Sequence, residues 1–148
     1  MPLLALDVAA VLVNRCATAA TTAGLDGSLA STLWLESIAT AMRDSGRFPE
    51  NPLTVVDSDL DDVPDWLVSQ VVDLAELRSL ETALNALMNP DRRISMGEIK
   101  YGQFRAVMET TIARKAKYIE NRYGIGRGTI VSGFVSMPIN EPLWPECL

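Results

Sequence analysis

Apolar residues recur every three or four positions over four stretches of the chain, and this spacing predicts helices. The first predicted helix covers residues 3–22 and ends before Gly24. The second starts at Asp26 or Ser28, either of which can cap a helix, and ends near residue 44 before Ser45 and Gly46. These two helices are expected to form a hairpin.

The two longest helices are predicted in the second half of the chain. One covers residues 64–89, where apolar positions keep helical spacing up to an Asn-Pro pair. The other opens at Ser95 and Glu98, which match a capping box: each side chain can accept a hydrogen bond from a free backbone N–H of the first turn. It runs to about residue 123, and Gly124 supplies a left-handed end.

The last 24 residues differ from the rest in composition, because glycine and proline are frequent and large apolar residues stand between them. Such a segment forms neither a helix nor a central strand. It carries too much apolar surface for a solvated tail, so we expect it to pack on its own helices or on another subunit. The side chains predicted to bind that partner are Ile130, Phe134, Ile139, Leu143 and Trp144. Trp144 is the expected anchor, since buried aromatic residues dominate interfaces.

The predicted fold is mainly α: a helical bundle built on two long helices, with an extended C-terminal arm. A helical domain is expected over residues 1–124 and the arm over residues 125–148. A chain of 148 residues with 48% hydrophobic residues can form one core without disulfide or metal support. Trp34 and Trp66 are predicted to pack in this core or in the helix hairpin rather than to bind a ligand.

Charge is distributed unevenly. Residues 50–91 carry ten acids and one base, whereas residues 92–127 carry nine bases and three acids. Neighbouring helices of opposite charge that pair with each other would explain this pattern. Complementary flanks on identical subunits that pack side by side would explain it too, and the two interpretations are compatible.

The composition argues against several classes of function. The chain has no histidine, which excludes Ser-His-Asp triads, Cys-His dyads and Cys2His2 zinc sites. A net charge of −6 argues against a nucleic-acid-binding domain. Two cysteines suggest no disulfide framework, so a reducing cytosol fits best. No apolar run is long enough to cross a membrane, and the N-terminus lacks the positive start of a secretion signal.

Three motifs resemble known sites only in part. Residues 46–62 hold two prolines and an acidic run, which favour a loop. The alternate aspartates Asp57, Asp59 and Asp61 in this segment imitate the start of an EF-hand calcium loop. The glycine and the bidentate glutamate that such a loop requires are missing. Glycines at 124, 126 and 128 follow a helix, whereas phosphate loops precede one. Glutamates at 98, 109 and 120 share a helix face but lack the histidines of a carboxylate metal site. We therefore expect no metal, no cofactor and no catalytic residue.

The order of elements nevertheless resembles a known family. A stretch from Asp73 to Glu81 (DLAELRSLE) on one of two long helices, a basic helix and a glycine-hinged C-terminal arm resemble the head-to-tail connector (adaptor) proteins of tailed bacteriophages. The resemblance implies a non-enzymatic virion component of the neck, made in the host cytoplasm. It also implies a homo-oligomeric ring, commonly a dodecamer, below the portal protein.

The same resemblance implies the other partners. The arm at residues 125–148 would dock on the portal, and a tail or stopper protein would be a further partner of the ring. DNA would pass through the lumen without sequence-specific binding. No membrane partner is implied. Two other hypotheses stay open at this stage: a cytosolic helical binding module or assembly chaperone that uses the apolar arm, and an enzyme that uses carboxylates.

Overall fold

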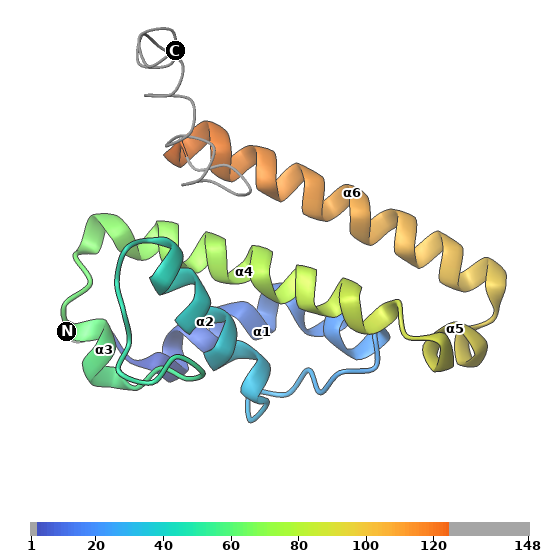
Figure 1. Ribbon diagram of the computed structural model, residues 1–148, viewed down its shortest axis with the longest axis horizontal. Coiled ribbons are helices and arrows are strands. Elements are labelled where there is room, and N and C mark those ends of the chain that lie inside the picture. The colour runs from blue at the N-terminus through green and yellow to red at the C-terminus, as the bar shows by residue number, and fades with distance from the viewer. Residues whose placement is uncertain (1–2, 125–148) are drawn as a thin grey trace, which may run out of the picture.

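The computed structural model describes residues 3–124, which fold into six helices (Figure 1). They are α1 (Ala5–Thr22), α2 (Thr32–Asp44), α3 (Asp57–Asp61), α4 (Asp65–Leu87), α5 (Pro90–Met96) and α6 (Glu98–Tyr123). No strand occurs among these residues. The mainly α class and the two long helices predicted from the sequence are therefore confirmed.

The main core lies between α1, α2 and α4. Small residues of α1 such as Ala9 and Ala20 are buried, which allows the helix backbones to approach closely. Trp34 of α2 is completely buried, and its indole N–H donates a hydrogen bond of 2.7 Å to the carbonyl of Ser28. The largest side chain of the core thus has its one polar atom satisfied.

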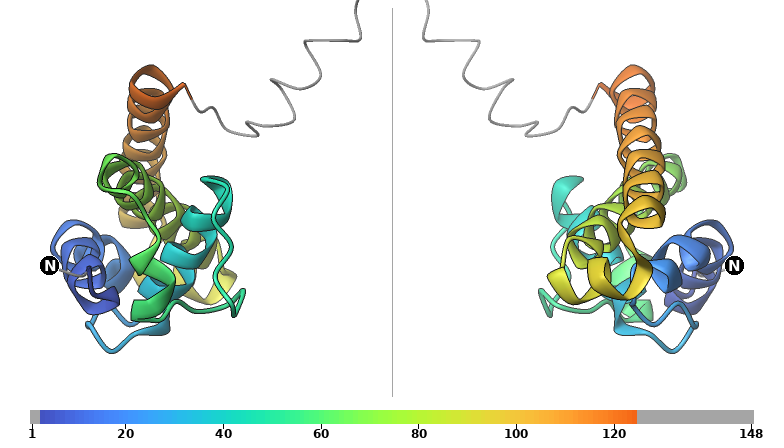
Figure 2. Two further views of the ribbon diagram at one scale, coloured as in Figure 1. Left: turned by 90° about the vertical axis from the view of Figure 1, so that its left-hand side faces the viewer. Right: turned by 90° about the vertical axis from the view of Figure 1, so that its right-hand side faces the viewer.

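Helix α6 lies on the side of α4 that faces away from α1 and α2, and runs antiparallel to α4 (Figures 1 and 2). Met108, Ile112 and Ile119 of α6 are buried against α4 and its neighbours. The helix ends where the sequence predicts, because Gly124 adopts a φ of 72° and its N–H caps the carbonyl of Glu120. Both flanks of α6 remain at the surface.

The short helix α5 was not predicted, although its start signal is present in the sequence. Asn89 caps it by accepting a hydrogen bond from the N–H of Asp91, and Pro90 occupies the first helical position. Arg92 then donates two hydrogen bonds to the carbonyl of Thr22, at 2.8 and 2.6 Å, so that α5 caps the C-terminus of α1. The segment between α4 and α6 therefore does more than separate these two helices, because it also binds the C-terminus of α1.

The predicted capping box at Ser95 and Glu98 is wrong. Ser95 lies in the last turn of α5, and α6 begins after Gly97, whose φ of 84° ends one helix and starts the next. Glu98 does not cap its own helix but accepts a hydrogen bond of 2.9 Å from Arg93. A glycine in the left-handed region therefore decides the boundary that the serine was expected to make.

The start of α2 is also later than predicted. Its cap is Ser31, which accepts from the N–H of Leu33, whereas Asp26 accepts from the N–H of Ser28 in a turn before the helix. Leu29 consequently lies outside the helix and is exposed. The segment predicted as a loop over residues 46–62 is a loop only up to α3, which forms at its end.

The two tryptophans for which the sequence predicts the same packing differ in burial. Trp34 is buried as predicted, but Trp66 in the first turn of α4 is 74% exposed, so its prediction as a core residue is wrong. Val107 of α6 is also largely exposed, at 62%. Both side chains lie outside the buried faces of their helices.

Candidate functional site

All five side chains predicted to bind a partner, Ile130, Phe134, Ile139, Leu143 and Trp144, lie outside the described residues, and so does the arm at residues 125–148. These predictions therefore remain predictions. The described surface offers two other features that bear on function. One is a charged network between α1, α4 and α6 with a groove beside it, and the other is an apolar loop on the opposite flank.

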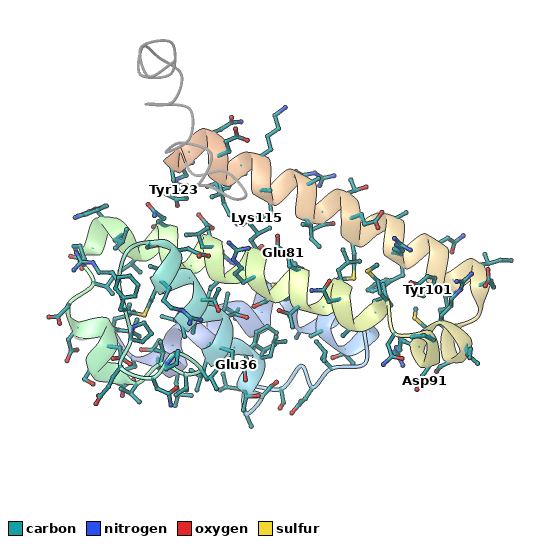
Figure 3. The ribbon with its side chains drawn as sticks, in the orientation of Figure 1. Glu36, Glu81, Asp91, Tyr101, Lys115 and Tyr123 are labelled. Carbon is teal, nitrogen blue, oxygen red and sulfur yellow. The ribbon has the colours of Figure 1, made fainter. Side chains whose placement is uncertain are left out.

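Asp73 is the centre of the charged network. Its carboxylate is buried in the middle of α4 and accepts hydrogen bonds from Lys115 Nζ at 2.8 Å and from the hydroxyl of Tyr123 at 2.7 Å. Both donors come from the side of α6 that faces α4 (Figure 3). One acidic side chain thus holds the last three turns of α6 on the bundle.

Glu76, one turn further along α4, extends the network to α1. It pairs with Lys115 at 3.0 Å and with Arg15 of α1 at 2.9 Å, and Arg15 also approaches Asp73 at 3.6 Å. Three helices are therefore connected by two acids and two bases. The prediction that a basic helix pairs with an acidic one is confirmed for these residues.

A groove lies beside this network, between α1 and α6, with α4 as its floor. Its central hollow has a volume of about 330 Å³ and is lined by Val11, Arg15, Val68, Ser69, Val72, Asp73, Tyr118 and Arg122. Val68 also lines a second hollow beside Leu3 and Asp7, and Tyr118 lines a third beside Arg114. The hollows share residues and so form one α1–α4–α6 groove.

The α6 side of the groove is aromatic and basic. Tyr118 is 42% exposed and contacts two cations through its ring, Lys115 at 5.1 Å and Arg122 at 5.7 Å. Arg122 also forms a hydrogen bond with the Tyr118 hydroxyl. These contacts fix an aromatic face at the edge of the groove, with positive charge around it.

The loop between α2 and α3, residues 45–56, displays two large apolar side chains. Phe48 is 79% exposed and Leu53 is 68% exposed. We refer to this segment as the Phe48 loop. In both views of Figure 2 it lies on the opposite side of α4 from α1, and therefore on the opposite flank from the groove.

The Phe48 loop is held in place although its tip is apolar. The carboxylate of Asp59 in α3 accepts hydrogen bonds from the N–H of Glu50 at 3.2 Å and of Val56 at 3.0 Å. Val55 is buried in the core, and the side chain of Asn51 accepts from the N–H of Leu53 at 2.9 Å. Phe48 and Leu53 are thus exposed on a pre-shaped loop.

The acidic and thiol side chains of residues 3–124 bear on metal binding and on nucleophilic chemistry. Within this range no group of three or more cysteines, aspartates or glutamates could hold a metal ion, and no buried side-chain N or O atom lacks a hydrogen-bond partner. Cys16 is buried, and burial together with the nearby Glu76 raises the pKa of its thiol to about 12. A thiol with such a pKa is a poor nucleophile.

Three titratable groups in and near the network make the stability of the fold depend on pH in the alkaline range. Partial burial and the hydrogen bond to Asp73 raise the pKa of Tyr123 from 10.0 to about 12. Burial opposes the charge of Lys115, but its bonds to Asp73 and Glu76 outweigh this and raise its pKa. With Cys16, three groups keep their protons longer in the folded state than in the unfolded state.

We expect the free energy of unfolding to fall as the pH rises from 9 to 12. A group with a raised folded pKa contributes its full stability below the unfolded pKa and loses it as the pH passes the folded pKa. Urea unfolding over this pH range measures the effect. Tyr123→Phe should reduce the slope between pH 10 and 12, and a slope equal to that of the parent would contradict this assignment.

Sequence reasoning missed both the groove and the Phe48 loop. A phenylalanine between glycine and proline residues is equally compatible with a buried loop anchor, whereas the structure leaves Phe48 exposed. Tyr118 carries a weak signal, since it stands among basic residues off the apolar stripe of its helix.

Among residues 3–124, no helix combines the length and the apolar character that crossing a membrane requires. Comparison with protein-family models, with curated proteins and with solved structures finds no match for this chain.

Proposed function

We propose that this chain is a subunit of a non-enzymatic head-to-tail connector ring in the neck of a tailed bacteriophage. In this proposal the helical domain packs side by side with identical copies below the portal protein. Residues 125–148 dock on the portal through Trp144 and the other apolar side chains of the arm. A tail or stopper protein binds the opposite face, and DNA passes through the lumen.

The observation that carries the proposal is the pair of unlike surfaces on opposite flanks of one rigid body. The α1–α4–α6 groove lies on one flank, and the exposed Phe48 and Leu53 lie on the other. A ring of identical subunits needs a heterologous contact of this kind, in which two different patches of the same chain meet. An isologous dimer would need one self-complementary patch instead.

Charge supports the same proposal. The C-terminal half of α6, residues 111–124, carries four bases and one acid, whereas residues 45–62 carry five acids and one base. Lys115 satisfies its charge inside the subunit, but Arg114, Lys117 and Arg122 are exposed. Opposite charges on separate segments of one subunit favour one orientation of neighbouring copies over the reversed one.

Sedimentation velocity of the full chain, beside a version that ends at Gly124, tests the proposal. We expect the full chain to form a species many times the 16.1 kDa mass of the monomer. Loss of that species from the shortened chain would assign the arm to contacts between copies as well as to the portal. Trp144→Ala should weaken assembly while its far-UV circular dichroism stays that of the parent. Ser136→Ala, in the same segment, is the matched control.

Two monomeric proteins in that experiment would count against the connector. The chain would then fit the alternative, a cytosolic helical binding module or assembly chaperone that uses its apolar C-terminal arm. A one-to-one complex with a single partner would distinguish this alternative, because a connector subunit contacts two neighbours of its own kind.

A further inference from the structure

We infer that the Phe48 loop of one copy inserts into the α1–α4–α6 groove of the next copy. This inference rests on the proposed ring and assigns the two surfaces that meet in it. The occupant of the groove is thus a second copy of this chain, contacting it through Phe48 and Leu53.

The two surfaces match in chemistry. The groove offers Val11, Val68 and Val72 in its floor and walls, and the ring of Tyr118 at its edge. Aromatic and aliphatic anchors that fill such a hollow supply most of the binding energy at interfaces. Phe48 and Leu53 are both more than two-thirds exposed in the single chain, so the contact would remove both side chains from water.

The charges match at one end of the groove. Arg114 and Arg122 border it beside Tyr118, whereas Glu50 stands between Phe48 and Leu53 in the loop. The loop carries one base, Arg47, and one acid, Glu50, and the acidic far end of the groove, near Asp7, would repel Glu50. Charge therefore places Glu50 at the α6 end of the groove.

The rigidity of both surfaces favours this contact. Asp59 and the buried Val55 hold the loop, and the pairing of Lys115 with Asp73 and Glu76 holds α6 beside α4. Neither surface has to become ordered when the copies meet, which lowers the entropic cost of association. Because the loop and the groove lie on opposite flanks, each copy can give its loop to one neighbour and receive a loop from the other.

A mixing experiment with two full-length variants tests the assignment. Phe48→Ser/Leu53→Ser removes the loop anchors and keeps the groove, whereas Tyr118→Glu alters the groove and keeps the loop. Alone, each variant should associate roughly 30-fold more weakly than the parent, the loss typical of a lost aromatic anchor. Mixed, they should form a complex that stops at two chains, because one native loop meets one native groove.

Controls separate this effect from loss of folding. Both variants should keep the far-UV circular dichroism of the parent, since all three side chains are exposed. Ile99→Ser, at an equally exposed apolar residue of α6 away from both surfaces, should leave association unchanged. Nuclear magnetic resonance of a labelled loop variant mixed with the unlabelled groove variant detects pairing even when it is weak, to dissociation constants on the order of 1 mM.

The outcomes distinguish this inference from the proposed function. No pairing of the variants at that concentration overturns the inference, and a ring formed by the parent would then leave the connector standing. Pairing of the variants without any closed assembly of the parent supports the inference and counts against the connector. Groove signals that shift when residues 125–148 are removed, and not on mixing, overturn the inference and assign the groove to the C-terminal arm.

Discussion

Replacing Asp73 with alanine is expected to lower the free energy of unfolding by about 3 kcal/mol. The carboxylate is buried and receives hydrogen bonds from Lys115 and Tyr123, so its removal leaves an ammonium group and a hydroxyl without their shared partner. Lys115 keeps Glu76 at 3.0 Å, which holds the loss at the lower end of the range for broken buried ion pairs. Urea unfolding followed by far-UV circular dichroism measures it.

The matched control is Glu109→Ala, which breaks an exposed ion pair with Arg105 one turn away on α6. Exposed pairs of this kind contribute little, so we expect a change within about 0.5 kcal/mol. A loss of less than about 1 kcal/mol for Asp73→Ala would mean that water replaces the network without cost. The network would then position α6 without stabilising the fold.

Local signals predicted most of the fold. The helices now called α1, α4 and α6 end within about two residues of their predicted positions, because glycine at 24 and 124 and the Asn-Pro pair at 89–90 stop a helix whatever packs around it. The boundaries that failed depend on a choice between two local signals. Gly97 and Ser95 compete for one helix start, and the chain uses the glycine.

Burial was harder to predict than helix formation. Trp34 and Trp66 stand near the starts of two amphipathic helices and are equally apolar, yet one is completely buried and the other is 74% exposed. Helical periodicity gives the direction of an apolar face to within about one residue. Which residue at the edge of that face is covered depends on the partner helix, and a single sequence does not contain that information.

The candidate site, too, could be predicted only in part from the sequence. Opposite charge on successive helices predicted that α4 and α6 pair, and Lys115 with Asp73 and Glu76 confirms it. No local pattern predicts the groove, because its lining comes from α1, α4 and α6, which are far apart in the sequence. The groove forms only once α1 and α6 are both packed against α4.

The two tryptophans give the second large expected effect. Trp34→Ala should lower the free energy of unfolding by about 4 kcal/mol, because it leaves a cavity in the core between α2 and its neighbours and removes the donor to the Ser28 carbonyl. Trp66→Ala should change it by no more than about 0.5 kcal/mol, since the side chain is largely in water already. Urea unfolding of the two variants is a direct comparison. Equal losses would show that Trp66 is covered in solution, as a residue in contact with a neighbouring copy would be.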